Sequence, residues 1–458
     1  MRIAFSLCLL LFAVMPLAAQ SNSAAAEQHI EAAQQAQANQ DCATAAKEYA
    51  AAVHLLPSSG ELRTNEGIAL YCDHRYSEAI PVLRKALSLN PNLTVPHLFL
   101  GLASFHLSDM ATATNQLEAA VRLMPKDVTS HLWLGYAYFA RQQNEGAAET
   151  FQAVLRLEPQ NVDARYALGQ AYFEIGRRRT IDLARLAPKG RGIRLLAAEQ
   201  QAMKSGTALK EPEGAPAIFK SAHEEQLYRE AVDAEKKAQA TLQKLLDEAP
   251  QSDRAHEIQG DAYSLQRNNK AAIREYDEVL KINPSLPGVR LALANCLMQA
   301  DRFNEALAAL TEEQHLTPQS ADVWASTGRV QLALGKDVEA ITSLKKAVGL
   351  PNAPPAARML LGKSLLRTGE AKEALAYLEQ ALREGADPAT TNYLLARAYR
   401  SLGNHEAMNK ALQAYQRSSQ DQAERQSAAA FIQRPAAVQT SMSAQETQEA
   451  SSMSAQHD

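Results

Sequence analysis

Residues 128–161, VTSHLWLGYAYFARQQNEGAAETFQAVLRLEPQN, decide the fold of this chain. Apolar residues recur at helical spacing in HLWLGYAYFA, and a second amphipathic stretch follows the polar RQQNEG. Gly135 lacks a Cβ and permits close helix approach, while Ala147 and Phe151 supply a small and a large side chain for the contact. Pro159 ends the second stretch, because proline cannot continue a helix. The stretch therefore predicts two antiparallel helices joined by a short turn.

The same pattern returns along the chain with a period of about 34 residues. A fixed period of this length indicates a repeat architecture, in which each unit buries its apolar face against its neighbours. The composition agrees, because 46% hydrophobic and 21% charged residues exclude a wholly disordered or collagen-like chain. The residues in constant phase are Pro57, Pro91, Pro125, Pro159, Pro250, Pro284 and Pro318; Gly67, Gly101, Gly135 and Gly169; and Ala45, Ala79, Ala113, Ala147, Ala272, Ala306, Ala340 and Ala374.

This repeat resembles the tetratricopeptide repeat (TPR) family, which has an aromatic, Leu-Gly, Tyr, Ala, Phe and Pro at fixed places in a unit of about 34 residues. The resemblance covers about two thirds of the chain, residues 26–175 and 251–416. It implies an all-α fold, a right-handed superhelical solenoid of antiparallel helix pairs. One departure is the fourth place of the unit, which often holds His or Arg. The matching residues are Leu134, Gly135, Tyr138, Ala272, Tyr276, Pro284, Trp324 and Gly328.

We expect two repeat blocks joined by an irregular helical segment. The phase is lost after Gly176, although LARLAP (183–188) and LQKLLDEAP (242–250) look like repeat ends. Whether the joining segment acts as a hinge stays open. The expected order is a signal peptide at 1–19, an N-terminal TPR block at 26–176, degenerate helical repeats with a loop insertion at 177–250, a C-terminal TPR block at 251–416, and a disordered Gln/Ser/Ala-rich tail at 417–458.

The first residues are typical of a cleaved secretory signal peptide. Met1-Arg2 precedes an apolar run from Ile3 to Leu17, and small residues follow before Gln20. The run is short for a membrane span of about 20 residues, and no later stretch is apolar enough for one. We therefore expect an exported, periplasmic or secreted protein of the bacterial type, with an uncleaved anchor as the alternative.

The family resemblance implies a binding groove lined by places 2, 5, 9, 12 and 13 of each unit. In the N-terminal block these places form an apolar, aromatic strip. An exposed strip of this kind is typical of an interaction site. The alternative is that tight curvature or an N-terminal helix already buries it. The strip comprises Leu98, Leu102, Phe105, Leu132, Tyr136, Phe139, Tyr166, Gln170 and Phe173.

In the C-terminal block the ninth place becomes basic, in the order Asp261, Asn295, Arg329, Lys363 and Arg397. Arg367 and Arg400 lie about one turn further along the same helices. Such a ladder of donors suits a carboxylate, an acidic peptide or another anion. The alternative is a solvated helix face with local ion pairs.

Three cysteines remain after the signal segment. Cys42 begins one expected helix and Cys72 ends the next, so that stacking brings the two to the same side. A disulfide between them suits an exported protein and would add roughly 3 kcal/mol. Two partly buried thiols are the alternative. We interpret Cys296 as a buried free thiol.

Other chemistry finds little support in the sequence. His97 and His131 recur in register, but they occupy a packing place and are interpreted as core residues rather than metal ligands. Phosphate-binding, zinc-protease and serine-hydrolase motifs are missing, and no cofactor is expected. The basic segment 177–194 indicates an envelope anion, an acidic partner or a solvated helix rather than nucleic acid, because the net charge is −4.

These observations predict a non-catalytic scaffold or adaptor of the cell envelope. It would bind segments of other proteins along its groove, on a preorganised surface. The alternative is a structural or assembly component of an envelope or secretion complex that works through oligomerisation.

Overall fold

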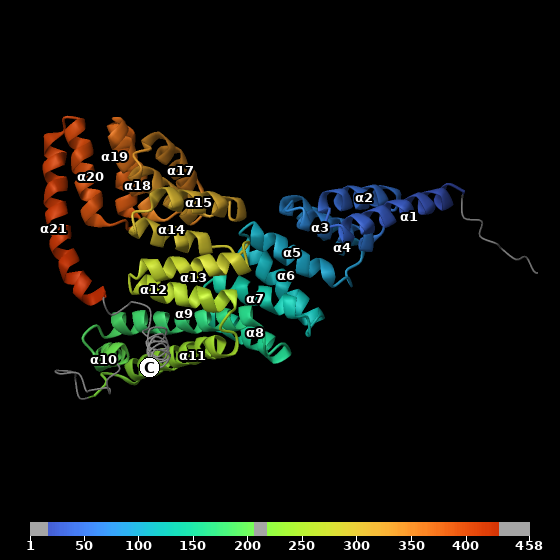
Figure 1. Cartoon of the computed structure of the whole chain (residues 1–458), viewed down its shortest axis with the longest axis horizontal. Helices are drawn as coiled ribbons and strands as arrows, with labels where there is room; N and C mark the ends of the chain where they lie inside the picture. The colour runs from blue at the N-terminus through green and yellow to red at the C-terminus, as the bar shows by residue number, and fades with distance from the viewer. Residues whose placement is uncertain (1–16, 206–217, 430–458) are drawn as a thin grey trace, which may run out of the picture. The chain divides into compact units, whose positions relative to one another are not determined.

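The computed structural model describes residues 17–205 and 218–429, and every regular element in these ranges is a helix (Figure 1). The contacts divide the chain into two units, one up to Tyr172 and one from Phe173. Most helices within each unit form consecutive antiparallel pairs. The predicted all-α class is thereby confirmed for the described part of the chain.

The first unit contains four helix pairs and the start of a ninth helix. Within it, each second helix also packs against the first helix of the following pair. The pairs are α1 (Leu17–Ala38) with α2 (Cys42–Leu55), α3 (Gly60–Cys72) with α4 (Tyr76–Leu89), α5 (Val95–His106) with α6 (Met110–Leu123), and α7 (Val128–Ala140) with α8 (Asn144–Leu157); α9 covers Val162–Leu186.

The second unit contains the end of α9, two further helices and five pairs. The two further helices are α10 (Arg191–Ser205) and α11 (Ala222–Glu248). The pairs are α12 (Asp253–Leu265) with α13 (Asn269–Ile282), α14 (Val289–Gln299) with α15 (Phe303–Leu316), α16 (Ala321–Ala333) with α17 (Asp337–Gly349), α18 (Pro355–Thr368) with α19 (Ala371–Arg383), and α20 (Pro388–Ser401) with α21 (His405–Ala429).

A glycine in the first helix sets the close contact within a pair. We number the places of a repeat unit so that this glycine stands at place 8. A Cβ at Gly135 would lie 2.5 Å from Cε1 of Phe151, and one at Gly328 would lie 2.4 Å from Cγ of Leu344. Phe151 and Leu344 are themselves fully buried. The close approach predicted from Gly135 and Phe151 is confirmed.

The turn inside each pair uses one residue in the left-handed region. This residue stands at place 15, for example His74 with φ 59° and Gln142 with φ 59°. Gly335, Gly369 and Gly403 hold the same place in the second unit with φ of 75°, 91° and 71°. The next amide closes the motif, as when Gln143 N donates to Tyr138 O at 2.9 Å. This is the usual left-handed termination of a helix, and it turns the chain sharply into the second helix.

The unusual His and Arg residues at the fourth place have structural partners. His97 hydrogen-bonds Gln116 at 2.8 Å, and His256 meets Glu275 at 2.8 Å, so both connect the two helices of a pair. His131 instead hydrogen-bonds the carbonyl of Pro125 at 3.1 Å, and Trp324 donates to the carbonyl of Pro318 at 2.9 Å. Both His97 and His131 are half-buried, so their interpretation as core residues is wrong, because each ring reaches a polar partner near the surface.

The two stretches expected as repeat ends both coincide with helix ends, LARLAP with the end of α9 at Leu186 and LQKLLDEAP with the end of α11 at Glu248. LARLAP is not a separate unit, because α9 continues without a break through Gly176 to Leu186 and stops just before Pro188. Leu183, Leu196 and Leu227 pack together, one each from α9, α10 and α11. The predicted loop insertion falls on residues 206–217, which lie outside the described residues.

The predicted tail and signal peptide lie only partly within the described residues. α21 continues to Ala429 and overlaps the start of the tail predicted from 417. Ala, Gln, Glu and Arg are good helix formers, so a sequence without an apolar face still permits this extension. Residues 430–458, and residues 1–16 of the predicted signal peptide, lie outside the described residues.

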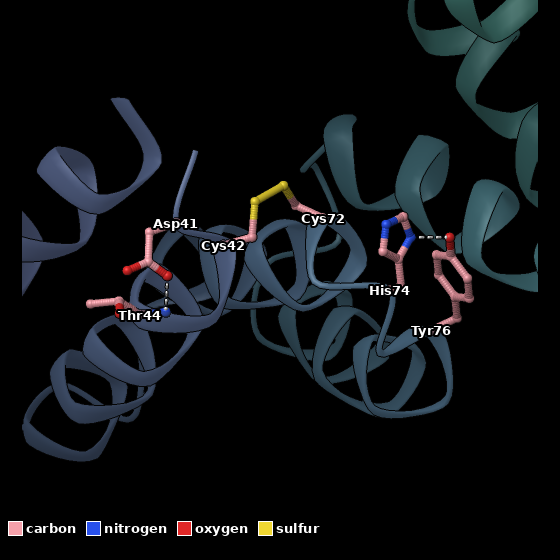
Figure 2. Close-up of a disulfide and its surroundings, with 6 residues drawn as sticks. All are labelled: Asp41, Cys42, Thr44, Cys72, His74 and Tyr76. Atoms are coloured by element: carbon pink, nitrogen blue, oxygen red, sulfur yellow. Dashed lines mark hydrogen bonds between the residues drawn. A yellow bond between two sulfur atoms is a disulfide. The ribbon is translucent and has the colours of Figure 1, made fainter. Parts of the chain in front are cut away.

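A disulfide joins Cys42, the first residue of α2, to Cys72, the last residue of α3 (Figure 2). The two Cα atoms lie 5.6 Å apart, a usual separation for a disulfide. Cys72 is exposed and Cys42 is half-buried. Cys296 is a free, buried cysteine whose Sγ lies 3.4 Å from Ser264 Oγ.

Candidate protein-binding surfaces

The first helices of neighbouring pairs touch one another directly. In the first unit α3 contacts α5 and α5 contacts α7; in the second, contacts run in sequence from α12 through α14, α16 and α18 to α20. We call the face where these helices meet the inner face of each unit. In the second unit a pocket of about 690 Å³ opens on it, lined among others by Leu291 at place 5, Asn295 and Arg329 at place 9, and Met298 at place 12. Places 5, 9 and 12 therefore share a hollow, as the family resemblance implies.

Two members of the predicted apolar strip are not available for binding. Leu98 is 9% exposed and Leu102 is 5% exposed. Both belong to a core cluster with Leu117 and Leu134. This corrects their assignment to an accessible strip: α5 is covered by α3 on one side and α7 on the other, so its middle places are core.

The other members of the strip keep part of their surface in solvent. Phe105, Leu132, Tyr136, Phe139 and Tyr166 are half-buried and lie in the first unit. Phe173 is half-buried as well, but it falls in the second unit.

Trp133, which the sequence analysis did not select, connects the aromatic side chains of the first unit. Its ring centroid lies 5.2 Å from that of Phe105 and 5.7 Å from that of Tyr136, both edge-to-face. Such geometry adds to the stabilisation from burial. Trp133 stands at place 6, which the expected groove places do not include. Its residue type could have identified it, because aromatic side chains are common at binding surfaces.

A second aromatic group lies beside the first. His106 stacks on Tyr76 with centroids 4.5 Å apart and planes 6° apart, and its Nε2 hydrogen-bonds Tyr71 Oη at 3.1 Å. Burial, and then the nearby His74, lower the pKa of His106. Burial, and then Tyr76, raise the pKa of Tyr71 to about 12. At neutral pH this group is therefore uncharged and extends the apolar character of the face.

His74 links this aromatic group to the disulfide. It follows Cys72 by two residues, and its Nδ1 hydrogen-bonds the hydroxyl of Tyr76 at 2.7 Å (Figure 2). The disulfide fixes the end of α3 against the start of α2, so it also fixes the turn that carries His74 and Tyr76.

The basic places of the second unit divide into engaged and unengaged cations. Arg329 donates to Asn295 Oδ1 at 2.6 Å, and loss of hydration lowers the pKa of its guanidinium even though the residue as a whole is exposed. Arg367 pairs with Asp337 at 3.0 Å and donates to the carbonyl of Leu332 at 3.2 Å, so it connects helices within the fold.

The side chains of Lys363, Arg397 and Arg400 make no hydrogen bond or ion pair within residues 17–205 and 218–429. Lys363 and Arg400 are exposed, and Arg397 is half-buried. Asp261, which opens the ladder, accepts a hydrogen bond from the Tyr276 hydroxyl at 2.8 Å and is engaged inside its own pair. The ladder thus ends in three cations that the described fold does not use.

The basic segment 177–194 has local partners in the second unit. Arg177 pairs with Glu174 at 2.5 Å, Arg179 pairs with Glu230 at 2.5 Å, and Arg185 lies 3.8 Å from Asp182. Exposed pairs of this kind contribute little to stability, but they do occupy the cations. The interpretation as a solvated helix face therefore fits this segment better than an anion site.

The described ranges offer neither a metal-binding cluster nor a membrane-spanning helix. Residues 17–205 and 218–429 hold no group of three or more His, Cys, Asp or Glu placed to bind a metal ion. In the same ranges no helix combines the length and the apolarity needed to cross a membrane.

Sequence models of known families match most of the repeat blocks. A model described as tetratricopeptide repeat matches residues 30–93, 100–155, 226–287 and 359–431, more than half of the chain. A second with the same description matches 265–330, and one described as TPR repeat matches 135–176. The match from 226 includes most of α11, and the last match reaches into the predicted tail.

No curated protein matches the chain, but solved structures do. One is MamA, 22% identical, with 36% of this chain and 96% of MamA covered at a TM-score of 0.33. YrrB, described as a TPR protein with an unusual peptide-binding site, is 19% identical over 39% of this chain and 93% of YrrB, with a TM-score of 0.34. A tetratricopeptide repeat protein of Parabacteroides merdae is 14% identical over 75% and 99%, with a TM-score of 0.38. At these TM-scores the likenesses carry no functional inference.

Proposed function

The chain belongs to the tetratricopeptide repeat family, and we propose that it is a non-catalytic scaffold of the cell envelope that holds segments of partner proteins. One observation carries the proposal: the inner faces keep side chains that stay partly open to solvent or lack a charge partner in the described part of the chain. In the first unit these are half-buried aromatic residues such as Phe105 and Phe139, and in the second they are unpaired cations such as Lys363.

The mechanism is multipoint binding to a surface that is already ordered. Each side chain of the inner face projects from a helix held by its own pair and by the next one. Little conformational freedom is then lost when a partner binds, and loss of such freedom is a major cost of association. The partly exposed aromatic rings gain further burial when a partner covers them, as the anchor residues of protein interfaces do.

Location in the envelope is part of the proposal. It is supported by the signal-like sequence at 1–19 and by the exposed Cys72 in a disulfide, because disulfides persist mainly in oxidising compartments. Mass spectrometry of the protein from the producing cell tests it. We expect a mature N-terminus near Gln20, whereas a chain that still carries Met1 in the soluble fraction would contradict export.

Site-specific photo-crosslinking tests the binding function. A photoreactive residue replaces Phe139 on the inner face of α7, and in a matched control it replaces Leu123, which is 49% exposed on the second helix α6. We expect peptides of a discrete set of partners to be linked at Phe139 and not at Leu123. Equal labelling at both positions would contradict an inner-face site. Sedimentation that shows a concentration-dependent polymer would favour an assembly component instead.

A further inference from the structure

α18 and α20, the first helices of the last two pairs, carry only basic charged residues. Within their bounds they contain five Lys or Arg residues and no Asp or Glu. Two of the five are used by the fold, because Arg358 pairs with Glu384 at 2.7 Å and Arg367 pairs with Asp337 at 3.0 Å. The remaining three are Lys363, Arg397 and Arg400, whose side chains lack partners in the described part of the chain.

Several cations elsewhere on the surface of the second unit have an acidic partner. Lys281 pairs with Glu278 at 2.6 Å, Arg302 with Glu305 at 2.6 Å, and Lys410 with Glu406 at 2.6 Å. The three unpaired cations of α18 and α20 lie together on the inner face, Lys363 and Arg397 at place 9 and Arg400 at place 12. Neighbouring like charges repel, and an anion placed between them removes that repulsion and attracts each of them.

The repeat fixes how far apart these cations stand. Arg329, Lys363 and Arg397 occupy place 9 of three successive first helices, and α16, α18 and α20 contact one another in sequence. Packed helices lie about 8–10 Å apart. The hydrogen bond of 2.6 Å between Arg329 and Asn295, which is also at place 9, shows that side chains at this place reach the neighbouring rung.

One extended protein conformation repeats at the same distance. A polyproline II helix has three residues per turn and rises about 3.1 Å per residue, so every third side chain points the same way about 9 Å further along. A β-strand does not match, because its side chains alternate faces and residues three apart point in opposite directions.

We propose that the inner face of α16, α18 and α20 binds an extended segment of a partner protein that carries an acidic residue at every third position. Arg329, Lys363 and Arg397 each meet one carboxylate, and Arg400 gives the last carboxylate a second cation. Arg329 keeps guanidinium donors for this contact while bonded to Asn295, because a guanidinium has five N–H groups. The inference rests on the proposed scaffold function and names the chemistry of its partner.

Three synthetic peptides of one length test the spacing and the sign of the charge. The first has glutamate at every third position among proline and alanine, the second has the same residues with the glutamates contiguous, and the third has lysine in place of glutamate. Fluorescence anisotropy with the full chain gives each affinity. We expect the spaced peptide to bind about tenfold more tightly than the contiguous one, which corresponds to about 1.4 kcal/mol. The lysine peptide should not bind.

Two triple variants with the same charge change test the location. Lys363→Ala/Arg397→Ala/Arg400→Ala removes the three unpaired cations, and Lys281→Ala/Arg302→Ala/Lys410→Ala removes three paired cations from outside the inner face. We expect the first to weaken binding of the spaced peptide about tenfold, as three surface contacts would, and the second to leave it unchanged. Five of the six side chains are exposed and Arg397 is half-buried, and circular dichroism verifies that both variants fold.

Equal affinity for the spaced and contiguous peptides, or equal effects of the two triple variants, would overturn the inference. Binding of phosphatidylglycerol vesicles without binding of the spaced peptide would overturn it too, because the ligand would then be a lipid surface. The crosslinking at Phe139 is a separate readout in the first unit. If it succeeds while the peptides fail, the scaffold function stands and only the acidic-partner inference is lost.

Discussion

Replacing Gly328 by alanine should destabilise the second unit, although alanine favours helix. The new Cβ would lie 2.4 Å from Cγ and 2.8 Å from Cδ2 of Leu344, which is fully buried. Either α16 and α17 separate or Leu344 leaves its rotamer, and overpacking of this kind costs about 1–3 kcal/mol. The higher helix propensity of alanine relative to glycine offsets about 1 kcal/mol of this cost. The net loss in the free energy of unfolding should therefore be up to about 2 kcal/mol.

A matched control and a double-mutant cycle separate the cost of overpacking from the gain in helix propensity. Gly349, at the end of α17, has no atom within 4 Å of the Cβ position, so Gly349→Ala should be neutral or stabilising by up to about 1 kcal/mol. Leu344→Ala alone should cost about 2–5 kcal/mol through the cavity it leaves. In Gly328→Ala/Leu344→Ala the new methyl group enters that cavity, so the two effects should fall short of additivity by about 1–3 kcal/mol.

Urea unfolding followed by tryptophan fluorescence measures these effects. The chain has two tryptophans, and a Trp133→Phe background leaves only Trp324, which lies on α16 itself. A local probe is needed because long repeat arrays do not always unfold in one step. If Gly328→Ala were as stabilising as Gly349→Ala, or if the double variant were simply additive, the close contact would not determine how the pair packs.

Two further predictions concern other parts of the molecule. Reduction of the Cys42–Cys72 disulfide, which spans 30 residues, should lower the stability of the first unit by about 3 kcal/mol. Thermal unfolding followed by the fluorescence of Trp133 measures this loss. No change on reduction, or an equal change when the reductant is added to Cys42→Ser/Cys72→Ser, would argue against a stabilising crosslink. Burial, and then Glu199, raise the pKa of Glu235 to about 7 from 4.5, so the folded chain binds this proton more tightly than the unfolded chain. The contribution of protonated Glu235 to the stability of the folded chain is therefore complete below pH 4.5 and is lost as the pH rises through about 7. Glu235→Gln should accordingly raise the free energy of unfolding at about pH 8 by up to about 3 kcal/mol and leave it nearly unchanged at about pH 4; an effect independent of pH would contradict this.

The sequence predicts the pairing of the helices because each pair is a local structure. Gly135 and Phe151 belong to the same repeat unit, and one short turn brings them together. The left-handed turn residue was visible only in part. Gly335, Gly369 and Gly403 hold this place in the last three repeats, but His74 and Gln142 adopt the same conformation without glycine. The turn geometry, set by the two helices, overrides the residue preference at those places.

The candidate surfaces were predicted less completely. The groove places implied by the family resemblance put Lys363 and Arg397 on one face, but this assignment gave the same weight to Arg367, which pairs with Asp337. It also counted Leu98 as accessible although neighbouring helices cover it, and it passed over Trp133. Each of these differences arises from a contact with a neighbouring helix or turn. The residues in such a contact belong to different repeat units and are far apart in the sequence.

The sequence by itself determined the repeat, the helix pairs and the chemical type of each inner place, because these follow from residue order within one repeat unit. Only the tertiary structure decided which of those side chains remain free to bind. Burial and charge pairing depend on what the neighbouring helices bring within a few ångströms, and a period in the sequence repeats positions without repeating their surroundings.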